Sequence, residues 1–173
     1  MKKITVVLIL CVLGTMLFSC GDDIVEELAD NTWTLTPEGN AAGSYRTKTI
    51  TLSTQTYQLL EVISMDNDRV VGGISSTLRL YFPTIGPPPT GTYSVKSIDK
   101  LSGKTNSVGI HLETFGDPST GLSTTYWNSQ ENSGQTVSVT FTDGKVSATF
   151  KDVTVTQTGT GPHTGTLSAN ISQ

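Results

Sequence analysis

The sequence predicts an all-β protein, an antiparallel β-sandwich of about nine or ten strands. Threonine is its commonest residue, and threonine favours strands. Apolar residues recur at every second position in many short segments, whereas a clean 3.6-residue apolar period is missing after residue 30. Clusters of Gly, Pro, Asn and Asp separate these segments at regular spacing, which is typical of a sandwich or a barrel.

The expected strands follow one another along the chain with short connections. Alternation is plainest in Leu78–Phe82, in Val108–Leu112 and in Leu167–Ile171, where apolar residues stand two apart and should face a core. The full set of expected strands is 32–36, 44–53, 56–65, 78–82, 91–97, 108–112, 122–128, 137–142, 145–156 and 167–171.

A hairpin at Asp143-Gly144 is the strongest local prediction. Both central residues of a type I′ turn need positive φ, which Asp tolerates and Gly adopts freely. A two-residue turn places Phe141 opposite Val146, and the same register places all six apolar side chains of the hairpin on one face. Turn chemistry and register therefore agree.

The first residues predict export and lipidation. Lys2 and Lys3 precede an apolar run over 4–18, which is shorter than the ~20 residues of a membrane-spanning helix. Leu17-Phe18-Ser19-Cys20 resembles the bacterial lipobox, in which peptidase cuts before a cysteine that carries diacylglycerol, so residues 1–19 are expected to be a cleaved signal. An ordinary secretory signal and an uncleaved anchor are the alternatives.

The residues after Cys20 predict an acidic tether over 20–31. Asp22 and Asp23 resemble the export signal of Bacteroidota surface lipoproteins, and a solvated acidic linker is the alternative. Two or more acyl chains anchor a protein stably in a membrane. The resemblance to the export signal implies the outer membrane as the location, with the chain facing the cell exterior or, alternatively, the periplasmic leaflet. Residues 22–31 are also the one helix candidate, with Ile24 and Leu28 four apart.

Charge separates this tether from the domain that follows. Removal of Lys2 and Lys3 leaves 9 basic against 15 acidic side chains, a formal charge of −6. Six of the acids precede Gly39, which leaves the rest of the chain balanced, and a balanced surface offers no basic footprint for nucleic acid. No cysteine remains beyond Cys20, so a single domain over 32–173 must be held by packing without disulfides.

Prolines interrupt the chain between two strands. Pro83 and the run over 87–89 remove backbone donors and fix φ, so they cannot lie in a central strand. A stiff surface loop and a site read by a polyproline-binding partner are the two interpretations.

A family resemblance covers roughly residues 78–171. Its motifs are Leu78–Pro83, Thr90–Val95, Gly134–Phe141, Lys145–Val153 and Thr164–Leu167. The chain resembles small, uncharacterised β-sandwich lipoproteins of the Bacteroidota. The resemblance implies the fold and carries over no functional residues.

Catalytic constellations are sparse. His111 and His163 are the only histidines; His111 should face away from its apolar neighbours and His163 should lie in a loop. No acid is flanked by residues that would raise its pKa, so neither catalysis nor a cofactor is expected. Asp66-Asn67-Asp68 offers three oxygen ligands and is a weak calcium candidate, but the spacing and closing Glu of an EF-hand are missing.

The segment 126–134 is the candidate ligand site. Aromatic rings stack on sugar faces and amides pair with hydroxyls, which is why Tyr126, Trp127, Asn128, Gln130 and Asn132 could bind a glycan. The alternative is a strand end with the tryptophan packed inward.

The expected function is that of a lipid-anchored, non-catalytic binding or envelope structural module. Its partners are the membrane and a glycan or an envelope protein. A lipocalin-like β-barrel that carries an apolar ligand is the alternative, suggested by Trp33 near the first strand, and a glycan hydrolase is the third. A carrier needs a cavity of hundreds of Å³, whereas a sandwich fills its middle with side chains.

Overall fold

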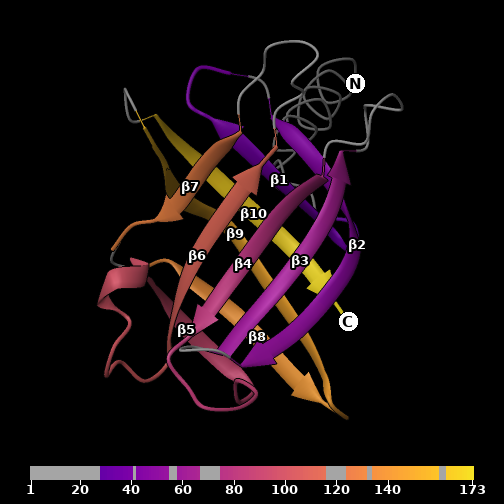
Figure 1. Ribbon diagram of the computed structural model, residues 1–173, viewed down its shortest axis with the longest axis vertical. Coiled ribbons are helices and arrows are strands. Elements are labelled where there is room, and N and C mark those ends of the chain that lie inside the picture. The colour runs from indigo at the N-terminus through magenta and orange to yellow at the C-terminus, as the bar shows by residue number, and fades with distance from the viewer. Residues whose placement is uncertain are drawn as a thin grey trace, which may run out of the picture.

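The structure is a computed structural model that describes residues 28–40, 42–54, 58–66, 75–115, 124–131, 134–159 and 163–173. Each expected strand is present, and the all-β fold is confirmed (Figure 1). The ten strands are β1 Thr32–Pro37, β2 Gly43–Thr54, β3 Gln58–Asp66, β4 Ser75–Phe82, β5 Gly91–Lys96, β6 Ser107–Thr114, β7 Thr125–Ser129, β8 Thr136–Thr142, β9 Lys145–Thr158 and β10 Thr164–Ser172, with one 3-10 turn, η1 Ile98–Lys100.

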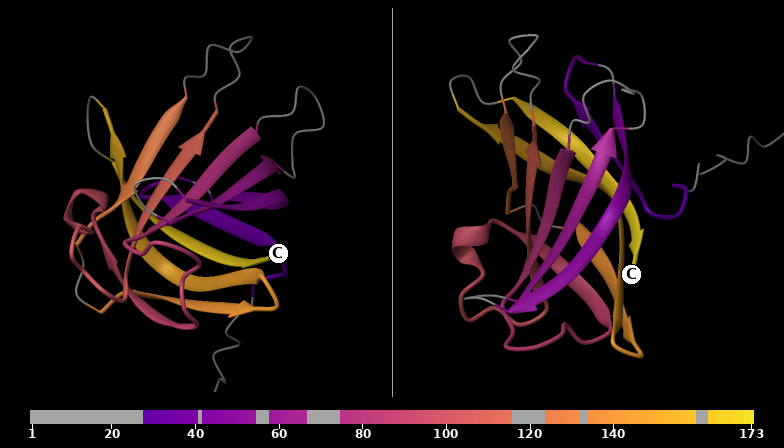
Figure 2. Two further views of the ribbon diagram at one scale, coloured as in Figure 1. Left: turned by 60° about the horizontal axis from the view of Figure 1, so that its bottom comes forward. Right: turned by 45° about the vertical axis from the view of Figure 1, so that its right-hand side comes forward.

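All ten strands belong to one hydrogen-bonded sheet, and the pairings of that sheet form a closed ring. The ring runs β1-β2-β3-β4-β6-β7-β9-β10 and returns to β1, with every neighbouring pair antiparallel. Figure 2 shows the strands winding around a common interior. The sandwich arrangement is therefore not confirmed, because the pairings join all strands in one sheet.

Strands β5, β7 and β8 make one side of the ring irregular. β7 pairs with the second half of β9, and β8 pairs with its first half, so β7 and β8 lie one after the other beside the same strand. β5 is inserted between β8 and the start of β6, and it runs parallel to β6. We call the place beside β6 where β7 ends at Ser129 and β5 ends at Lys96 the fork.

The β8–β9 hairpin has the expected register and turn. Phe141 lies opposite Val146, and Asp143 and Gly144 have φ of 53° and 77°, as a type I′ turn requires. The other apolar residues of the hairpin face are buried, whereas Phe141 is only half-buried.

A single apolar core fills the interior of the ring. Trp33 of β1 is fully buried and stacks on Tyr45 of β2, with ring centroids 3.9 Å apart and planes within 12°. Phe82 and Tyr93 meet edge to face at 5.2 Å on the other side. The closed ring resembles the wall of the barrel alternative, and aromatic and aliphatic side chains of the described residues pack together inside it.

The residues just before β1 are bound to the sheet. Asn170 of β10 donates its amide to the carbonyl of Leu28 at 3.1 Å, and Asn31 accepts the backbone N–H of Ser172 at 2.8 Å. The backbone carbonyl of Asn31 also accepts the N–H of Thr47 at 2.8 Å. Within the described residues, the contacts of the domain thus reach back to Leu28, four residues before the expected start at Thr32, and we call residues 28–31 the tether root.

Candidate functional site

One serine side chain joins β6 to β5 at the fork. The fully buried hydroxyl of Ser129 accepts the backbone N–H of Ile110 at 2.8 Å and donates to the carbonyl of Lys96 at 2.7 Å. A hydroxyl can accept and donate at once, so it satisfies both backbone groups where no strand neighbour is present.

On the β9 side of the fork, the side chain of a glutamine likewise satisfies backbone groups that have no strand neighbour. The amide of Gln135 donates to the carbonyl of Asp152 at 2.9 Å and accepts the N–H of Thr154 at 3.1 Å. Its backbone carbonyl accepts the N–H of Val95 at 3.0 Å. A side-chain amide carries the same donor and acceptor as a peptide group, so Gln135 bridges the gap between β7 and β8.

The connection from β5 to β6 builds one wall of a cleft. Parallel neighbours need a crossover, and here residues 97–106 cross over, with η1 inside them. A Cβ at Gly109 would stand 2.8 Å from Ile98 Cγ1 and 2.9 Å from Leu101 Cδ1, so the missing side chain lets the crossover lie directly on β6. Leu101 is fully buried there, and it fixes the crossover in place.

A pocket of ≈ 650 Å³ lies between this crossover and the end of β7. We call it the fork cleft. Its lining residues come from the two segments that meet at the fork: Ser97, Ile98, Asp99, Lys100, Asn128, Ser129 and Gln130.

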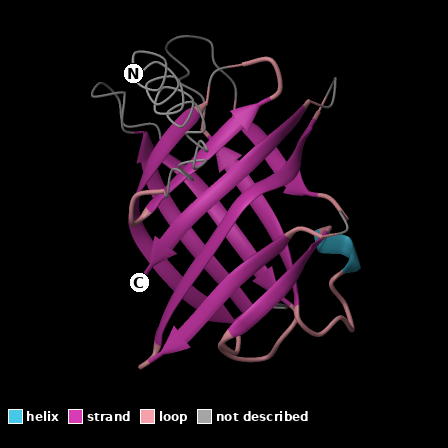
Figure 3. Cartoon of the chain, turned by 180° about the vertical axis from the view of Figure 1, so that it is seen from behind, coloured by secondary structure: helices cyan, strands magenta, loops and turns pink. Residues whose placement is uncertain are grey.

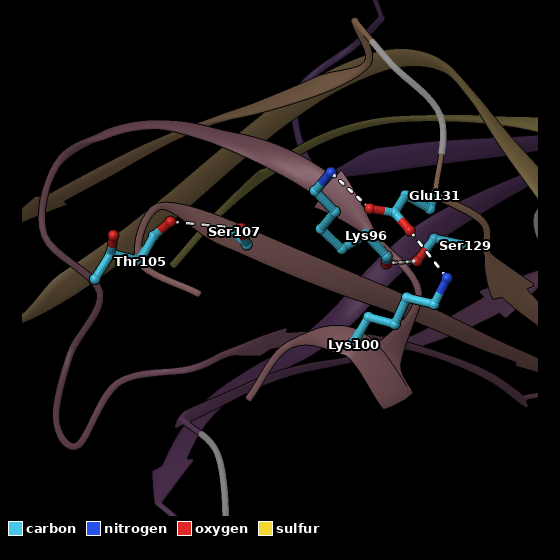
Figure 4. Close-up of polar contacts among 6 residues, drawn as sticks. All are labelled: Lys96, Lys100, Thr105, Ser107, Ser129 and Glu131. Carbon is cyan, nitrogen blue, oxygen red and sulfur yellow. Dashed lines mark hydrogen bonds and ion pairs between the residues drawn. The ribbon is translucent and has the colours of Figure 1, made fainter. Parts of the chain in front are cut away.

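Two lysines converge on one carboxylate at the rim of the fork cleft (Figure 4). Lys96 Nζ and Lys100 Nζ each lie 3.1 Å from a different oxygen of Glu131. The hydrogen bond from Lys100, then that from Lys96, lowers the pKa of Glu131 below its ordinary value, and the bond to Glu131 raises the pKa of Lys100. Both groups are exposed to solvent, where ion pairs are weak, so this pairing is open to exchange.

A polar patch with one exposed ring leads into the cleft along the outer face of β6 and β7. Tyr126 is 42% exposed and stacks on His111 with ring centroids 6.0 Å apart. A ring nitrogen of His111 is 2.8 Å from the amide oxygen of Asn128, which itself lines the cleft. As expected, His111 faces away from the core.

The structure corrects the expected role of Trp127. Its side chain is only 4% exposed and lies inside the ring, and its indole N–H donates to Thr125 Oγ1 at 3.2 Å. A Cβ at Gly165 would stand 3.3 Å from this ring, so the glycine leaves it space. The tryptophan therefore cannot offer a face to a sugar, because strand alternation turns Trp127 inward and Tyr126 outward.

The remaining predicted site residues divide between the fork and the undescribed segments. Asn128 and Gln130 both line the fork cleft beside the exposed ring of Tyr126. Cys20, Asp22, Asp23, Asn67, Asp68 and Asn132 lie outside the described residues.

The calcium candidate Asp66 and the loop histidine His163 do not line the fork cleft. Asp66 ends β3 opposite Tyr45, and His163 is exposed before β10. Within the described ranges, no three His, Cys, Asp or Glu side chains gather as metal ligands would.

Sequence reasoning missed Lys96, Lys100 and Glu131. The two lysines come from the end of β5 and the crossover after it, and Glu131 follows β7, so they meet because β5 and β7 both lie beside β6. The only sequence feature that could have indicated these residues is the spacing of the two lysines, four positions apart, and such a spacing is common on protein surfaces.

Scans against protein-family models, curated proteins and solved structures found no match. In the part of the chain that the structure describes, no helix has the length and hydropathy of a membrane span.

Proposed function

We propose that this protein is a lipid-anchored lipoprotein of the outer-membrane surface that binds glycans without transforming them. One observation carries the ligand class: the exposed ring of Tyr126 lies beside His111 and Asn128 on a rigid sheet, next to the polar fork cleft. The leader that precedes Cys20 supports the anchor.

The chemistry of these groups suits a sugar. A tyrosine ring packs against the C–H face of a pyranose, while the amides of Asn128 and Gln130 can both donate to and accept from hydroxyls. The cleft volume of ≈ 650 Å³ falls within the usual range for small-ligand sites, about 300–1,000 Å³. Strand β7 holds Tyr126 and Asn128 in fixed positions, which lowers the entropic cost of binding.

Three glutamates near the patch and the cleft are held in ion pairs with basic side chains, which favours binding over hydrolysis. A glycosidase needs two carboxyl groups directed at one glycosidic bond. Glu61 and Glu113 are instead directed at Arg79, with distances of 2.7 Å to its Nε and 3.4 Å to its Nη1. These ion pairs hold the outer face of β3, β4 and β6 together.

A glycan array probed with the full chain, purified in detergent, tests the ligand class. Tyr126→Ala should reduce glycan binding by about 10-fold or more, because it removes the stacking face. Ile85→Ala is the matched control, since Ile85 is 99% exposed on the loop between β4 and β5 and should leave binding unchanged. An array without hits, or equal losses in both variants, would refute glycan binding through this patch.

Labelling of whole cells tests the anchor and the address separately. Cys20→Ala should abolish incorporation of a fatty-acid analogue, and an unmutated protein that takes up no label contradicts lipidation. Replacing Asp22 and Asp23 with Ala should keep the lipid but reduce digestion by protease added to intact cells. Equal digestion of both forms would mean that the acidic pair is a plain linker.

A further inference from the structure

The fork cleft already holds a carboxylate, and that carboxylate belongs to the protein. Lys96 ends β5, Lys100 ends η1 and Glu131 follows β7, yet both ammonium groups lie 3.1 Å from the oxygens of Glu131. Each ammonium approaches its own oxygen, so the two lysines form a seat that fits the two oxygens of a carboxylate (Figure 4).

The two lysines differ in their freedom to re-pair. Lys96 is 27% exposed, whereas Lys100 is 58% exposed and lines the cleft itself. A long exposed side chain gives up a surface ion pair at little cost, because water solvates both partners. Lys100 can therefore turn to a ligand while Lys96 keeps Glu131 neutralised.

Because of the other charges at the cleft, binding of an anion there requires Lys100. Asp99 lines the cleft, and Glu131 stands at its rim, so two carboxylates face two ammonium groups. Without Lys100 the local balance becomes negative and repels an acidic ligand. The amide side chains that line the cleft are those of Asn128 and Gln130, which suit sugar hydroxyls.

We infer that the fork cleft selects glycans that carry a carboxylate, the hexuronate class, with Lys100 as the residue that pairs with this group and Glu131 as an internal competitor for the same ammonium. This inference rests on the glycan binding proposed above. It adds the substrate class, and it assigns opposite roles to Lys100 and Glu131.

The test measures binding of the full chain in detergent to two probes, a galacturonic acid tetramer and the same tetramer with its carboxyl groups reduced. The unmutated protein should bind the acidic probe about 10-fold more tightly, and salt should weaken the binding of that probe alone. Lys100→Gln should remove the preference, so that the acidic and the reduced probe bind with similar affinity. Lys145→Gln is the matched control, because Lys145 is exposed at the β8–β9 turn, and it should keep the preference.

Glu131→Gln gives the sharpest result, because the competing models predict opposite signs. Loss of an internal competitor should tighten binding of the acidic probe about three- to tenfold. If Glu131 instead accepted sugar hydroxyls, the same change would weaken both probes. Thermal melts of each variant check that the fold is kept.

Three outcomes overturn the inference: equal affinity for both probes, weaker acidic binding in Glu131→Gln, or failure of the unmutated protein to bind the acidic probe. The array with Tyr126→Ala decides the proposed function on its own. Neutral-sugar hits on that array with no uronate preference here would leave glycan binding in place and remove only the acidic specificity.

Discussion

The two sides of the ring are built in different ways. On one side, β2, β3 and β4 follow one another in sequence and pair along long, antiparallel backbone ladders. On the other side, β5, β7 and β8 share the space between β6 and β9, and two side chains, those of Ser129 and Gln135, replace missing backbone partners. The regular side is stabilised by many similar backbone hydrogen bonds, whereas the fork depends on single side chains. The cleft lies at the fork.

The largest effect should come from Trp127→Ala, which tests whether the fork side is packed as tightly as the regular side. The indole is 4% exposed inside the ring, so its loss should cost about 3–5 kcal/mol of unfolding free energy. Phe82→Ala on the regular side is the matched comparison and should cost a similar amount. Denaturant melts measure both, and a loss below about 1 kcal/mol for Trp127 alone would mean that the fork side is loosely packed.

Ser129→Ala should have the next largest effect. It leaves the N–H of Ile110 and the carbonyl of Lys96 without their partner in a buried place, which should cost about 2–4 kcal/mol. Ser138→Ala removes an exposed hydroxyl from β8 and should stay within about 0.5 kcal/mol. Hydrogen exchange at Ile110 should accelerate only in the first variant, and equal exchange in both would show that the hydroxyl does not bridge the strands.

Gly144→Val tests the β8–β9 turn, whose conformation depends on local sequence and not on the long-range contacts of the fork. Valine at a φ of 77° is strained, and the change should cost about 1–3 kcal/mol. Gly144→Asn is the control, because asparagine tolerates positive φ and should cost much less. Similar melting curves for valine and asparagine would contradict the type I′ turn.

The smallest expected effect is the titration of Glu131. Its folded-state pKa lies below the ordinary value of 4.5, since Lys100 and then Lys96 bind the carboxylate. The stabilisation is therefore present above pH 4.5 and is lost as pH falls through the lowered value. Carboxyl NMR should show a pKa below 4.5 that rises in Lys100→Gln and rises less in Lys96→Gln, whereas Lys145→Gln leaves it unchanged. An ordinary pKa in the unmutated protein would mean that the ion pairs do not form in solution.

The regular features could be predicted because their causes are local. Alternation and the turn residues between segments predicted the strands, and Asp143-Gly144 predicted both the turn and its register. The ring closure and the fork could not be read in the same way, because their contacts join distant residues: Ser129 and Lys96 are 33 positions apart, and Gln135 and Asp152 are 17 apart.

The candidate ligand site was predicted in part for the same reason. Alternation shows that Tyr126 and Trp127 face opposite ways, but it does not say which of them faces the core. That choice depends on packing between distant strands, where Gly165 of β10 lies beside the Trp127 ring.

The tether root and the fork cleft lie on opposite sides of the molecule, which has a mechanical consequence. The root is bound to the end of β10, and Figure 3 shows the C-terminus and the short helix of the crossover at opposite sides of the ring. If the chain is anchored and binds a surface glycan as we propose, any pull between membrane and ligand crosses the whole ring. β1 has a hydrogen-bonded neighbour on each side. A force on the tether would therefore act on the hydrogen bonds to β2 and β10 together, and β1 could not separate as a free edge strand.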